Sequence, residues 1–393
     1  MRKVAYSNVL IYHYDDMALI SSNRNGFPHF MLKEIHEQPE AMQVMLEHWI
    51  DSSGRFIAPP GFFSPEELRE ISKITIAASG SSRHAGLVGE FMLERMIRVP
   101  VEVDFASQYC YRDPVVGANE LTILISQSGT TVDTIAALQE ARQKGSKSLA
   151  ICNVPDSPLT RDSDATLLTY AGEEIAIAAT KSFSAQLTAL FLLSLYMAQC
   201  RRTSFANIDP LVQELKLLPA SINRLLSADE KYQQLATEFA GCKDFLVMGR
   251  DIDYPIALEG ALKLKEASYI HAEGYPTGEI KHGPAALVSE HLPIIVLATR
   301  DNNDAASALR YQKTVSNIRE FAERGVRILA IVTEGDTEIA SETPYVISMP
   351  PASVLLQPLL EVIPLQLLAY HLGILKGYNV DQPRNLSKSV LVE

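Results

Sequence analysis

The sequence contains four cysteines among its 393 residues, and none of them lies close to another. There is no CxxC pair, and no histidine stands at the spacing of a metal ligand. This pattern excludes a disulfide framework and gives no indication of a bound metal. We therefore expect buried free thiols at Cys110, Cys152, Cys200 and Cys242.

Positive charge is also scarce, with 35 Lys and Arg against 47 Asp and Glu and a formal net charge of −12 at pH 7. Nucleic acid and an anionic membrane are not attracted to such a chain, so we expect neither as a partner. The amino terminus starts basic but reaches two aspartates before any apolar segment, which is unlike a signal peptide. The expected location is the cytoplasm.

Long uninterrupted apolar runs are absent. The two most apolar stretches, residues 183–200 and 354–375, are interrupted by Gln186 and by two prolines and Glu361. A membrane-spanning helix needs about 20 mainly apolar residues with few or no charges. We expect both stretches to be core helices or helices of a subunit interface.

The chain does contain an alternation of β-rich runs and helical segments, in a globular composition that allows two or three domains. Strands separated by roughly 10–20 helical residues predict βαβ units and a parallel sheet. In the first half we predict helices at 29–50 and 179–200, with strands at 73–79, 99–105, 120–126, 146–152 and 165–170.

The pattern restarts after a polar helical segment at about 208–240. In the second half we predict strands at 244–249, 293–299, 327–333 and 345–350, with helices at 255–269, 304–324 and 353–376. A duplicated α/β unit is the expected architecture. We divide the chain into a linker-like leader at 1–30, a first domain at 31–225, a second domain at 226–380 and a tail at 381–393.

Two turns in the first half are rich in hydroxyl groups: residues 78–86 (ASGSSRHAG) after the first predicted strand and 126–134 (SQSGTTVDT) after the third. In open α/β sheets ligands bind beyond the carboxyl ends of the strands, where free N–H groups of the next helix attract anions. The turns predict a phosphate site, although plain N-capping is the alternative for either turn alone. Neither has GxxxxGK[ST] or GxGxxG, so we expect no cofactor.

Residues 257–273 (ALEGALKLKEASYIHAE) combine a charged stripe with an apolar surround. At about 100° per residue, Glu259, Lys263 and Glu266 share one face. This indicates a helix packed on most sides with its charges facing a cavity, whereas an ordinary surface pair with a solvated Glu266 is the alternative. We expect residues 271–287, which are rich in glycine and proline, to form an irregular loop. His282 in this loop is a candidate acid or base, although a lone histidine is more often structural.

Several segments carry a resemblance to a known family. They are SQSGTTVDT, YPIALEGALKLKEASYIHAEGYPTGEIKHGPAAL and DQPRNLSKSVLVE, with LKEIHEQP near the start and AICNVPDSPLTRDSD between them. From about residue 31 onward the chain resembles the isomerase part of glucosamine-6-phosphate synthase, the glutamine:fructose-6-phosphate amidotransferase. The resemblance implies two SIS (sugar isomerase) domains, each a flavodoxin-like α/β sandwich with a five-stranded parallel sheet, and a homodimer.

The resemblance also implies roles for individual residues. A hexose 6-phosphate would be held by Ser81, Ser82, Ser126, Gln127, Ser128 and Thr131, with Ile177 and Ser387 also in the substrate site. Glu266 would move a proton between C1 and C2, and Lys388 would form an imine with the open-chain ketose. Lys263 and Glu259 would support the site, and His282, delivered from the partner subunit, would open the sugar ring.

Simple chemistry agrees with these implied roles. Isomerisation needs a carboxylate placed over two adjacent carbons and a cation that stabilises the charge formed between them. Lys388 must be partly neutral to attack a carbonyl, and desolvation beneath a closing tail would favour the neutral amine.

The chain departs from the family in three places. The family enzyme carries an amino-terminal glutaminase domain that starts with a nucleophilic cysteine, whereas this chain begins with Met1 and Arg2. Thr130 stands where the family usually has Glu, and Ala179 where it often has Ser. We therefore expect no glutaminase activity in this chain, ammonia from solution or from a separate glutaminase, and an altered substrate fit.

The leading hypothesis is the interconversion of fructose 6-phosphate plus ammonia and glucosamine 6-phosphate. A stand-alone glucosamine-6-phosphate deaminase, or a related phosphosugar isomerase, is the nearest alternative. A non-catalytic sugar-phosphate sensor is a more distant one. A sensor would keep the hydroxyl turns and lack Glu266, His282 and Lys388, all of which are present.

Overall fold

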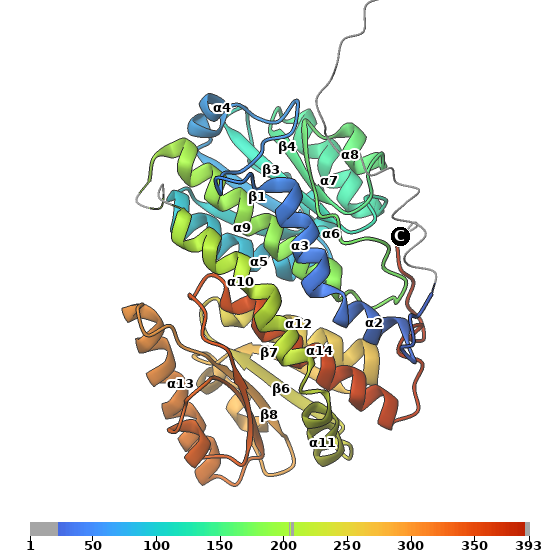
Figure 1. The fold of residues 1–393 in the computed structure, drawn as a ribbon, viewed down its shortest axis with the longest axis vertical. Helices are drawn as coiled ribbons and strands as arrows, with labels where there is room; N and C mark the ends of the chain where they lie inside the picture. Colours follow the sequence, from blue (N-terminus) through green and yellow to red (C-terminus); the bar gives the residue numbers. More distant parts are fainter. Residues whose placement is uncertain (1–22, 204, 206–207, 390–393) are drawn as a thin grey trace, which may run out of the picture.

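A computed structural model describes residues 23–203, 205 and 208–389, which form two α/β units (Figure 1). The strands of the first unit are β1 Lys73–Ala78, β2 Val101–Phe105, β3 Glu120–Ser126, β4 Lys147–Cys152 and β5 Ala165–Leu168. Its helices are α2 Phe30–His36, α3 Gln38–Trp49, α4 Pro65–Glu70, α5 Gly80–Ile97, α6 Ala106–Tyr109, α7 Val132–Gln143, α8 Pro158–Asp162 and α9 Lys181–Arg201. Each predicted strand of this half is present, with ends that differ by at most two residues.

The second unit follows two connecting helices, α10 Asp209–Leu226 and α11 Asp229–Phe239. Its strands are β6 Asp244–Gly249, β7 His271–Pro276, β8 Ile294–Ala298, β9 Ile328–Thr333 and β10 Tyr345–Met349. Its helices are α12 Asp253–Ser268, α13 Ala305–Glu323 and α14 Gln357–Leu375, with short 3-10 turns at Ile280–His282 and Pro284–Leu287.

Both sheets are parallel throughout. The first has the order β2-β1-β3-β4-β5 and the second β10-β9-β8-β6-β7. Counted from its own first strand, the second sheet repeats the order of the first, which is the flavodoxin-like arrangement. The predictions of a duplicated α/β unit and of five-stranded parallel sheets are confirmed, while the domain limits at residues 30, 225 and 380 stay predictions.

The inner strands are continuous apolar runs. In β3 (ELTILIS) all residues after the first are buried, and in β9 (ILAIVT) all are buried. Such strands show no alternation because helices cover both faces of a parallel sheet. This is why short apolar runs sufficed to locate them in the sequence.

The edge strand β7 corrects one prediction, that of an irregular segment directly after α12. β7 pairs with β6 along its whole length, from Asp244 opposite His271 to Gly249 opposite Pro276. Its sequence HAEGYP contains glycine and proline, which are uncommon within strands and are tolerated at an edge. The segment becomes irregular only after Pro276.

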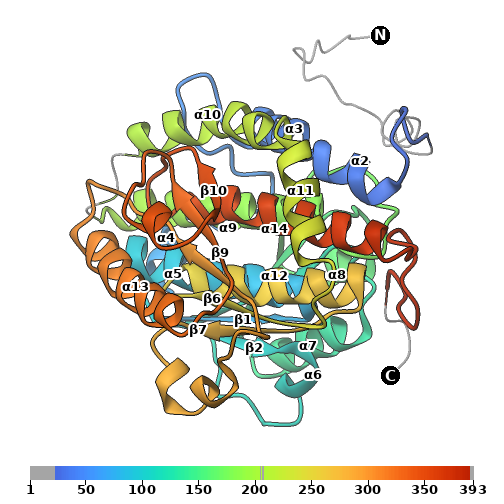
Figure 2. The same cartoon turned by 90° about the horizontal axis from the view of Figure 1, so that it is seen from below.

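Four helices fill the space between the two sheets in Figure 1: α5 packs on α9, α12 packs on α14, and each pair contacts the other. Two helices, α9 and α14, are long and apolar enough to cross a membrane, and 89% of the most apolar 18-residue window of each is buried in the structure. Both serve here as core helices, in agreement with the sequence prediction. Seen from below, α2, α3, α10 and α11 line one side of the molecule (Figure 2).

All four cysteines lie in the part of the chain that the structure describes, and each is a thiol outside any disulfide. Cys152 and Cys200 are buried as expected, whereas the expectation of burial is wrong for Cys110 and Cys242, which are partly exposed. The physical reason is position, since Cys110 ends the short helix α6 and Cys242 lies in the turn before β6.

Candidate functional site

The two hydroxyl-rich turns open side by side. In the parallel pair β1 and β3, Ala78 lies opposite Ile125, so the turns that begin at Ser79 and Ser126 leave the sheet at the same level. The strand order reverses at β1 and β3, because β2 lies on one side and β4 on the other. Such a switch point is where ligands bind in open α/β sheets.

The turn after β3 is wound tightly around Gly129. Ser126 Oγ accepts a hydrogen bond from the Gly129 N–H at 3.0 Å and lies 3.2 Å from Thr131 Oγ1. Gly129 has a φ of +66°, and an added Cβ would collide with Ser157. Glycine is therefore required here for both conformation and space. Thr130 donates its hydroxyl hydrogen to Ser128 Oγ at 2.9 Å, a contact within the turn.

N-capping does not account for these hydroxyls. Thr131 and Ser79 stand at the N-cap positions of α7 and α5, and neither makes a side-chain cap. By contrast, Ser64 and Ser157 do cap α4 and α8 with their hydroxyls. The first N–H groups of α5 and α7 are left without a capping side chain, which suits an anion at this edge of the sheet.

The charged stripe of α12 is buried. Glu259 and Lys263 have no exposed side-chain surface and Glu266 retains 18%. Lys263 Nζ lies 3.3 Å from Glu259 Oε1 and forms a second ion pair with Glu266. The prediction of a helix packed on most sides is confirmed, and the alternative of a surface pair with a solvated Glu266 is wrong, whereas the expectation that the charges face a cavity stays a prediction.

This stripe meets the first hydroxyl turn. Ser81 Oγ donates to Glu259 Oε1 at 2.8 Å and accepts from Lys263 Nζ at 3.3 Å. His84 Nδ1 lies 2.7 Å from the other oxygen of Glu259. The start of α5 in the first unit and the middle of α12 in the second unit therefore form one polar site.

The sequence does not indicate a role for His84, although this residue lies in the first hydroxyl turn, residues 78–86. Nothing in a helix start predicts which distant carboxylate its histidine will reach. The sequence does show that His84 comes three residues after Ser81, and residues at this spacing are neighbours on a helix surface.

The charges of the stripe stabilise one another. Burial by itself would raise the pKa of Glu259, but Lys263, His84 and Ser81 hold it below its usual value. Burial opposes the charge of Lys263 as well, yet Glu259 and Glu266 raise the pKa of this lysine above its usual value. Lys263 is therefore a fixed cation beside Glu266, placed to stabilise negative charge that forms there.

Lys388 lies against the segment after β5. Its Nζ donates to Glu174 Oε2 at 2.6 Å and to the Ala176 carbonyl at 2.6 Å. Ile177 donates its N–H to the Asp381 carbonyl at 3.0 Å. The tail therefore runs along residues 174–177, with Lys388 turned inward.

Helix α9 connects this tail contact to the hydroxyl turns. Glu174 Oε1 accepts the N–H groups of Thr180 and Ser182 at the start of α9. Four residues further along, Gln186 Nε2 donates to Ser82 Oγ at 3.0 Å. Four residues of helix span about 6 Å, so Lys388 and the first hydroxyl turn meet the same two turns of α9.

Several predicted site residues are not joined to Ser81, the charged stripe or Lys388 by a side-chain hydrogen bond. The hydroxyls of Ser126, Ser128 and Thr131 bond within their own turn, and Ile177 takes part through its backbone N–H. Ser387 is exposed and donates its hydroxyl hydrogen to the Ser389 carbonyl within the tail. Gln127 is half-buried in the second turn. His282 is exposed, and its imidazole forms no hydrogen bond or ion pair with the described part of the chain. One chain does not bring His282 to Glu266, and its delivery by a partner subunit stays a prediction.

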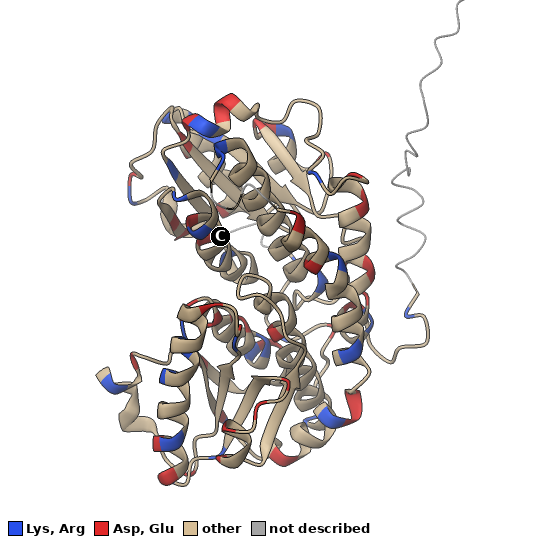
Figure 3. Cartoon of the chain, turned by 60° about the vertical axis from the view of Figure 1, so that its left-hand side comes forward, with Lys and Arg blue, Asp and Glu red and all other residues tan. Residues whose placement is uncertain are grey.

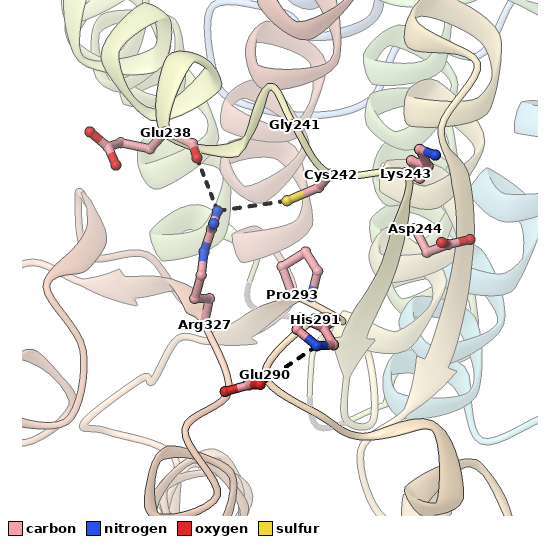
Figure 4. Close-up of a pocket in the computed structure, with 9 residues that line it drawn as sticks. All are labelled: Glu238, Gly241, Cys242, Lys243, Asp244, Glu290, His291, Pro293 and Arg327. Atoms are coloured by element: carbon pink, nitrogen blue, oxygen red, sulfur yellow. Dashed lines mark hydrogen bonds and ion pairs between the residues drawn. The ribbon is translucent and has the colours of Figure 1, made fainter.

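Two depressions bear on where a ligand binds. One, of about 470 Å³, is lined by Asp244, Pro293 and Arg327 among others and lies at the amino ends of β6, β8 and β9 (Figure 4). This is the opposite end from ligand sites in parallel sheets. The other, of about 520 Å³, is lined by His84 together with residues of α12 and β7, and so adjoins the charged stripe.

At the corresponding edge of the second sheet, the described residues do not form a similar hydroxyl-rich turn. Arg310 Nη1 lies 3.3 Å from Asp253 Oδ1, and Thr299 donates to Glu361 at 2.6 Å, with all four residues buried. Ionic side chains fill the place that hydroxyls occupy in the first unit. Among the described residues, no group of three or more His, Cys, Asp or Glu side chains is arranged to hold a metal ion.

Comparison with known proteins agrees with this fold. The SIS domain family matches residues 67–196 and 238–376, one stretch in each unit. The chain therefore belongs to the SIS-domain family, with the domain in tandem. More narrowly, it aligns with the carboxyl-terminal part of glutamine–fructose-6-phosphate aminotransferase (isomerizing). It is 45% identical to that protein of Chlorobaculum tepidum over 96% of this chain and 61% of the relative.

Other relatives give the same picture. The corresponding protein of Caldanaerobacter subterraneus is 45% identical over 95% of this chain and 60% of its own length, so the chain spans about 60% of such relatives. The solved carboxyl-terminal domain of glucosamine-fructose-6-phosphate aminotransferase from Francisella tularensis has a TM-score of 0.86 at 38% identity, covering 92% of this chain and all of that one. Glucosamine-6-phosphate deaminase of Thermotoga maritima, at 22% identity and a TM-score of 0.69, shares the fold.

Proposed function

We propose that the chain is a synthase-type isomerase that interconverts fructose 6-phosphate plus ammonia and glucosamine 6-phosphate. One observation carries the proposal: Ser81, in the first hydroxyl turn, is bonded to both Glu259 and Lys263 of the buried stripe. In this proposal the phosphate site and the carboxylate–ammonium site are parts of one centre, which these two hydrogen bonds support. The names of the relatives supply the substrate.

In the proposed reaction the two turns hold the 6-phosphate. The side chains of Ser81, Ser82, Ser126, Gln127, Ser128 and Thr131 and the N–H groups at the start of α7 supply hydrogen bonds without a cationic side chain. Such a site binds the phosphate dianion through oriented dipoles, which suits a protein of net negative charge.

The reactive end of the sugar would then lie between the stripe and the tail. Lys388 forms an imine at C2 of the open-chain ketose, and Glu266 moves a proton between C1 and C2. Lys263 stabilises the charge that develops, and Glu259 holds Lys263 in place. Ile177 and Ser387 bound the sugar from the segment after β5 and from the tail.

We infer that ammonia comes from solution or from a separate glutaminase. We also infer that the chain forms a homodimer and acts in the cytoplasm. The dimer is supported by the 520 Å³ depression beside His84 and by Leu287, which is 59% exposed on the same irregular segment as His282. A partner's segment seated in that depression would cover Leu287 and bring the partner's His282 towards the sugar. Lys and Arg are interspersed with Asp and Glu along the ribbons of both units (Figure 3), and we infer no nucleic-acid partner.

The direct test is turnover in both directions. The purified chain is incubated with fructose 6-phosphate and ammonium, and separately with glucosamine 6-phosphate, and each product is assayed. We expect both products, with Glu266→Gln lowering kcat by roughly 10²–10⁴-fold. Glu323→Gln, at an exposed carboxylate at the end of α13, serves as the matched control and should leave kcat unchanged.

Two other outcomes would point elsewhere. Release of ammonia from glucosamine 6-phosphate without any synthesis would favour a stand-alone deaminase. Tight binding of both sugars without turnover would contradict the enzyme and favour a sensor.

A further inference from the structure

The contact of Lys388 with Glu174 has a feature that the proposed mechanism does not use. Glu174 has no exposed side-chain surface, whereas the Lys388 side chain retains 25%. Each oxygen of the carboxylate accepts two hydrogen bonds: Oε1 from the N–H groups of Thr180 and Ser182, and Oε2 from Ser182 Oγ at 2.7 Å and Lys388 Nζ at 2.6 Å. The carboxylate is therefore held rigidly while the amine reaches it from the tail.

Two buried carboxyl groups in this region have pKa values that are shifted in opposite directions. Burial would raise the pKa of Glu174, but Lys388 and the hydrogen bonds from Thr180 and Ser182 lower it to about 2. Glu34 of α2 accepts the N–H groups of Ile175 and Ala176, and burial together with the charge of Glu174 raises its pKa to about 8. Lys388 and the hydrogen bonds around Glu174 therefore favour its charged form, whereas burial and the charge of Glu174 favour the neutral form of Glu34.

We propose that Glu174 is the counter-ion of the protonated imine formed at Lys388, an inference that rests on the proposed function. When the amine attacks C2, a C–N bond forms and the carbonyl oxygen leaves as water. The ammonium first passes one proton to solvent water, which frees the nitrogen lone pair for the attack, and that proton returns when the oxygen leaves. Over the whole step, two of its three protons end in the departing water and one stays on nitrogen. The positive charge therefore remains on the same atom, 2.6 Å from Glu174 Oε2.

A fixed anion at this place has a definite effect on the reaction. An opposite charge within hydrogen-bond distance favours the charged form of a titrating group. Glu174 would keep the imine protonated, and a protonated imine withdraws electrons from C1 as Glu266 removes the proton there. Glu174 is not the proton acceptor in this scheme, because its four hydrogen bonds and lowered pKa make it a weak base.

Other charged groups packed around this segment are engaged elsewhere. Lys181 at the start of α9 pairs with Glu37 at 2.8 Å, and Lys33 of α2 pairs with the same carboxylate at 3.1 Å. Asp381 of the tail accepts the N–H groups of Phe30 and Met31. Glu34 is the other buried carboxyl on this segment, and its pKa is shifted in the opposite direction to that of Glu174. It does not contact Lys388 through a hydrogen bond, so it provides the matched control.

The test is reductive trapping as a function of pH. The chain is incubated with fructose 6-phosphate and cyanoborohydride, which reduces protonated imines, and the label on Lys388 is quantified by peptide mass spectrometry. For the unmodified chain we expect labelling to decline only at high pH. In Glu174→Gln the alkaline decline should move to lower pH by about 1–3 units, since the carboxylate no longer stabilises the charge.

The control is the same substitution at the protonated neighbour. Glu34→Gln removes a carboxyl that favours its neutral form and has no hydrogen bond to Lys388, so its alkaline decline should stay where the unmodified chain has it. Glu174→Asp keeps a charge at a longer distance and should give an intermediate shift, and it carries the test if Glu174→Gln does not fold.

The outcomes separate the two proposals. Labelling of Lys388 with an alkaline decline that stays in place in both Glu174 variants would overturn the counter-ion alone. A decline that moves equally in Glu34→Gln would overturn it too, because a general disturbance of the segment would then be the cause. No label on Lys388 in the unmodified chain would remove the imine itself, and with it both proposals.

Discussion

Lys263 is the residue on which the buried charges of the site depend. It lies between Glu259, which is fully buried, and Glu266, which is nearly so. Without its ammonium, Glu259 would keep only His84 and Ser81 as partners, and Glu266 would lose its ion pair. Removing one partner of a buried ion pair is costly because the other charge remains buried and unpaired.

We expect Lys263→Met to lower the free energy of unfolding by about 3–5 kcal/mol. Lys265, exposed on the same helix, offers the matched control, and Lys265→Met should change it by less than about 0.5 kcal/mol. Urea unfolding followed by circular dichroism measures both. Equal effects of the two substitutions would mean that the stripe is not held by its central cation.

At the scale of elements, the position of α12 depends on close contacts at three glycines. A Cβ at Gly274 of β7 would lie 2.5 Å from the Leu258 Cα, and one at Gly260 would lie 2.8 Å from the Leu365 side chain of α14. A Cβ at Gly373 of α14 would lie 2.4 Å from the carbonyl oxygen of Ala267 in α12. Helix α12 is therefore enclosed between β7 and α14 with no room to shift, and its charged stripe is fixed relative to the hydroxyl turns.

Gly274→Ala should displace α12 and lower both stability and turnover. Overpacking of this kind costs about 1–3 kcal/mol, and the backbone of Leu258 offers no flexible side chain that could move aside. Gly241→Ala is the control, since a Cβ there would meet nothing within 4 Å. Thermal unfolding and kcat are the measurements. A Gly274→Ala protein with unchanged kcat would contradict the tight seating of α12.

At the scale of the whole molecule, one chain leaves a predicted participant outside its own site. His282 is exposed, while Glu266 lies within the packed interface of the two units. In a symmetric dimer each subunit would use the partner subunit's His282. Two differently disabled chains would then restore one site in a mixed dimer.

We expect Glu266→Gln and His282→Ala to be inactive alone and to recover about a quarter of the normal activity when mixed in equal amounts and allowed to exchange subunits. Half of the dimers are then mixed, and each has one intact site. The activity of the mixture against that of each variant is the measurement. If His282 served its own chain, every site in the mixture would carry a lesion and no recovery would occur.

The sequence by itself determined much of the architecture. Apolar runs of strand length, separated by helical segments, located nine of the ten strands, because burial on both faces of a parallel sheet demands such runs. The face shared by Glu259, Lys263 and Glu266 followed from helical geometry alone. β7 was not predicted because its sequence contains a glycine and a proline, which are uncommon within strands and are tolerated at the edge of a sheet. The sequence does not show which strand will lie at an edge.

Only the tertiary structure decided which of these groups meet. His84 reaches Glu259 across 175 residues of sequence and Lys388 reaches Glu174 across 214. Local periodicity specifies the direction of a side chain on its own helix or strand, whereas contacts between distant elements arise from the packing of the whole chain. Glu34 and Glu174 are the same residue type in the sequence, and only their hydrogen bonds and neighbours make one a buried acid and the other a buried anion.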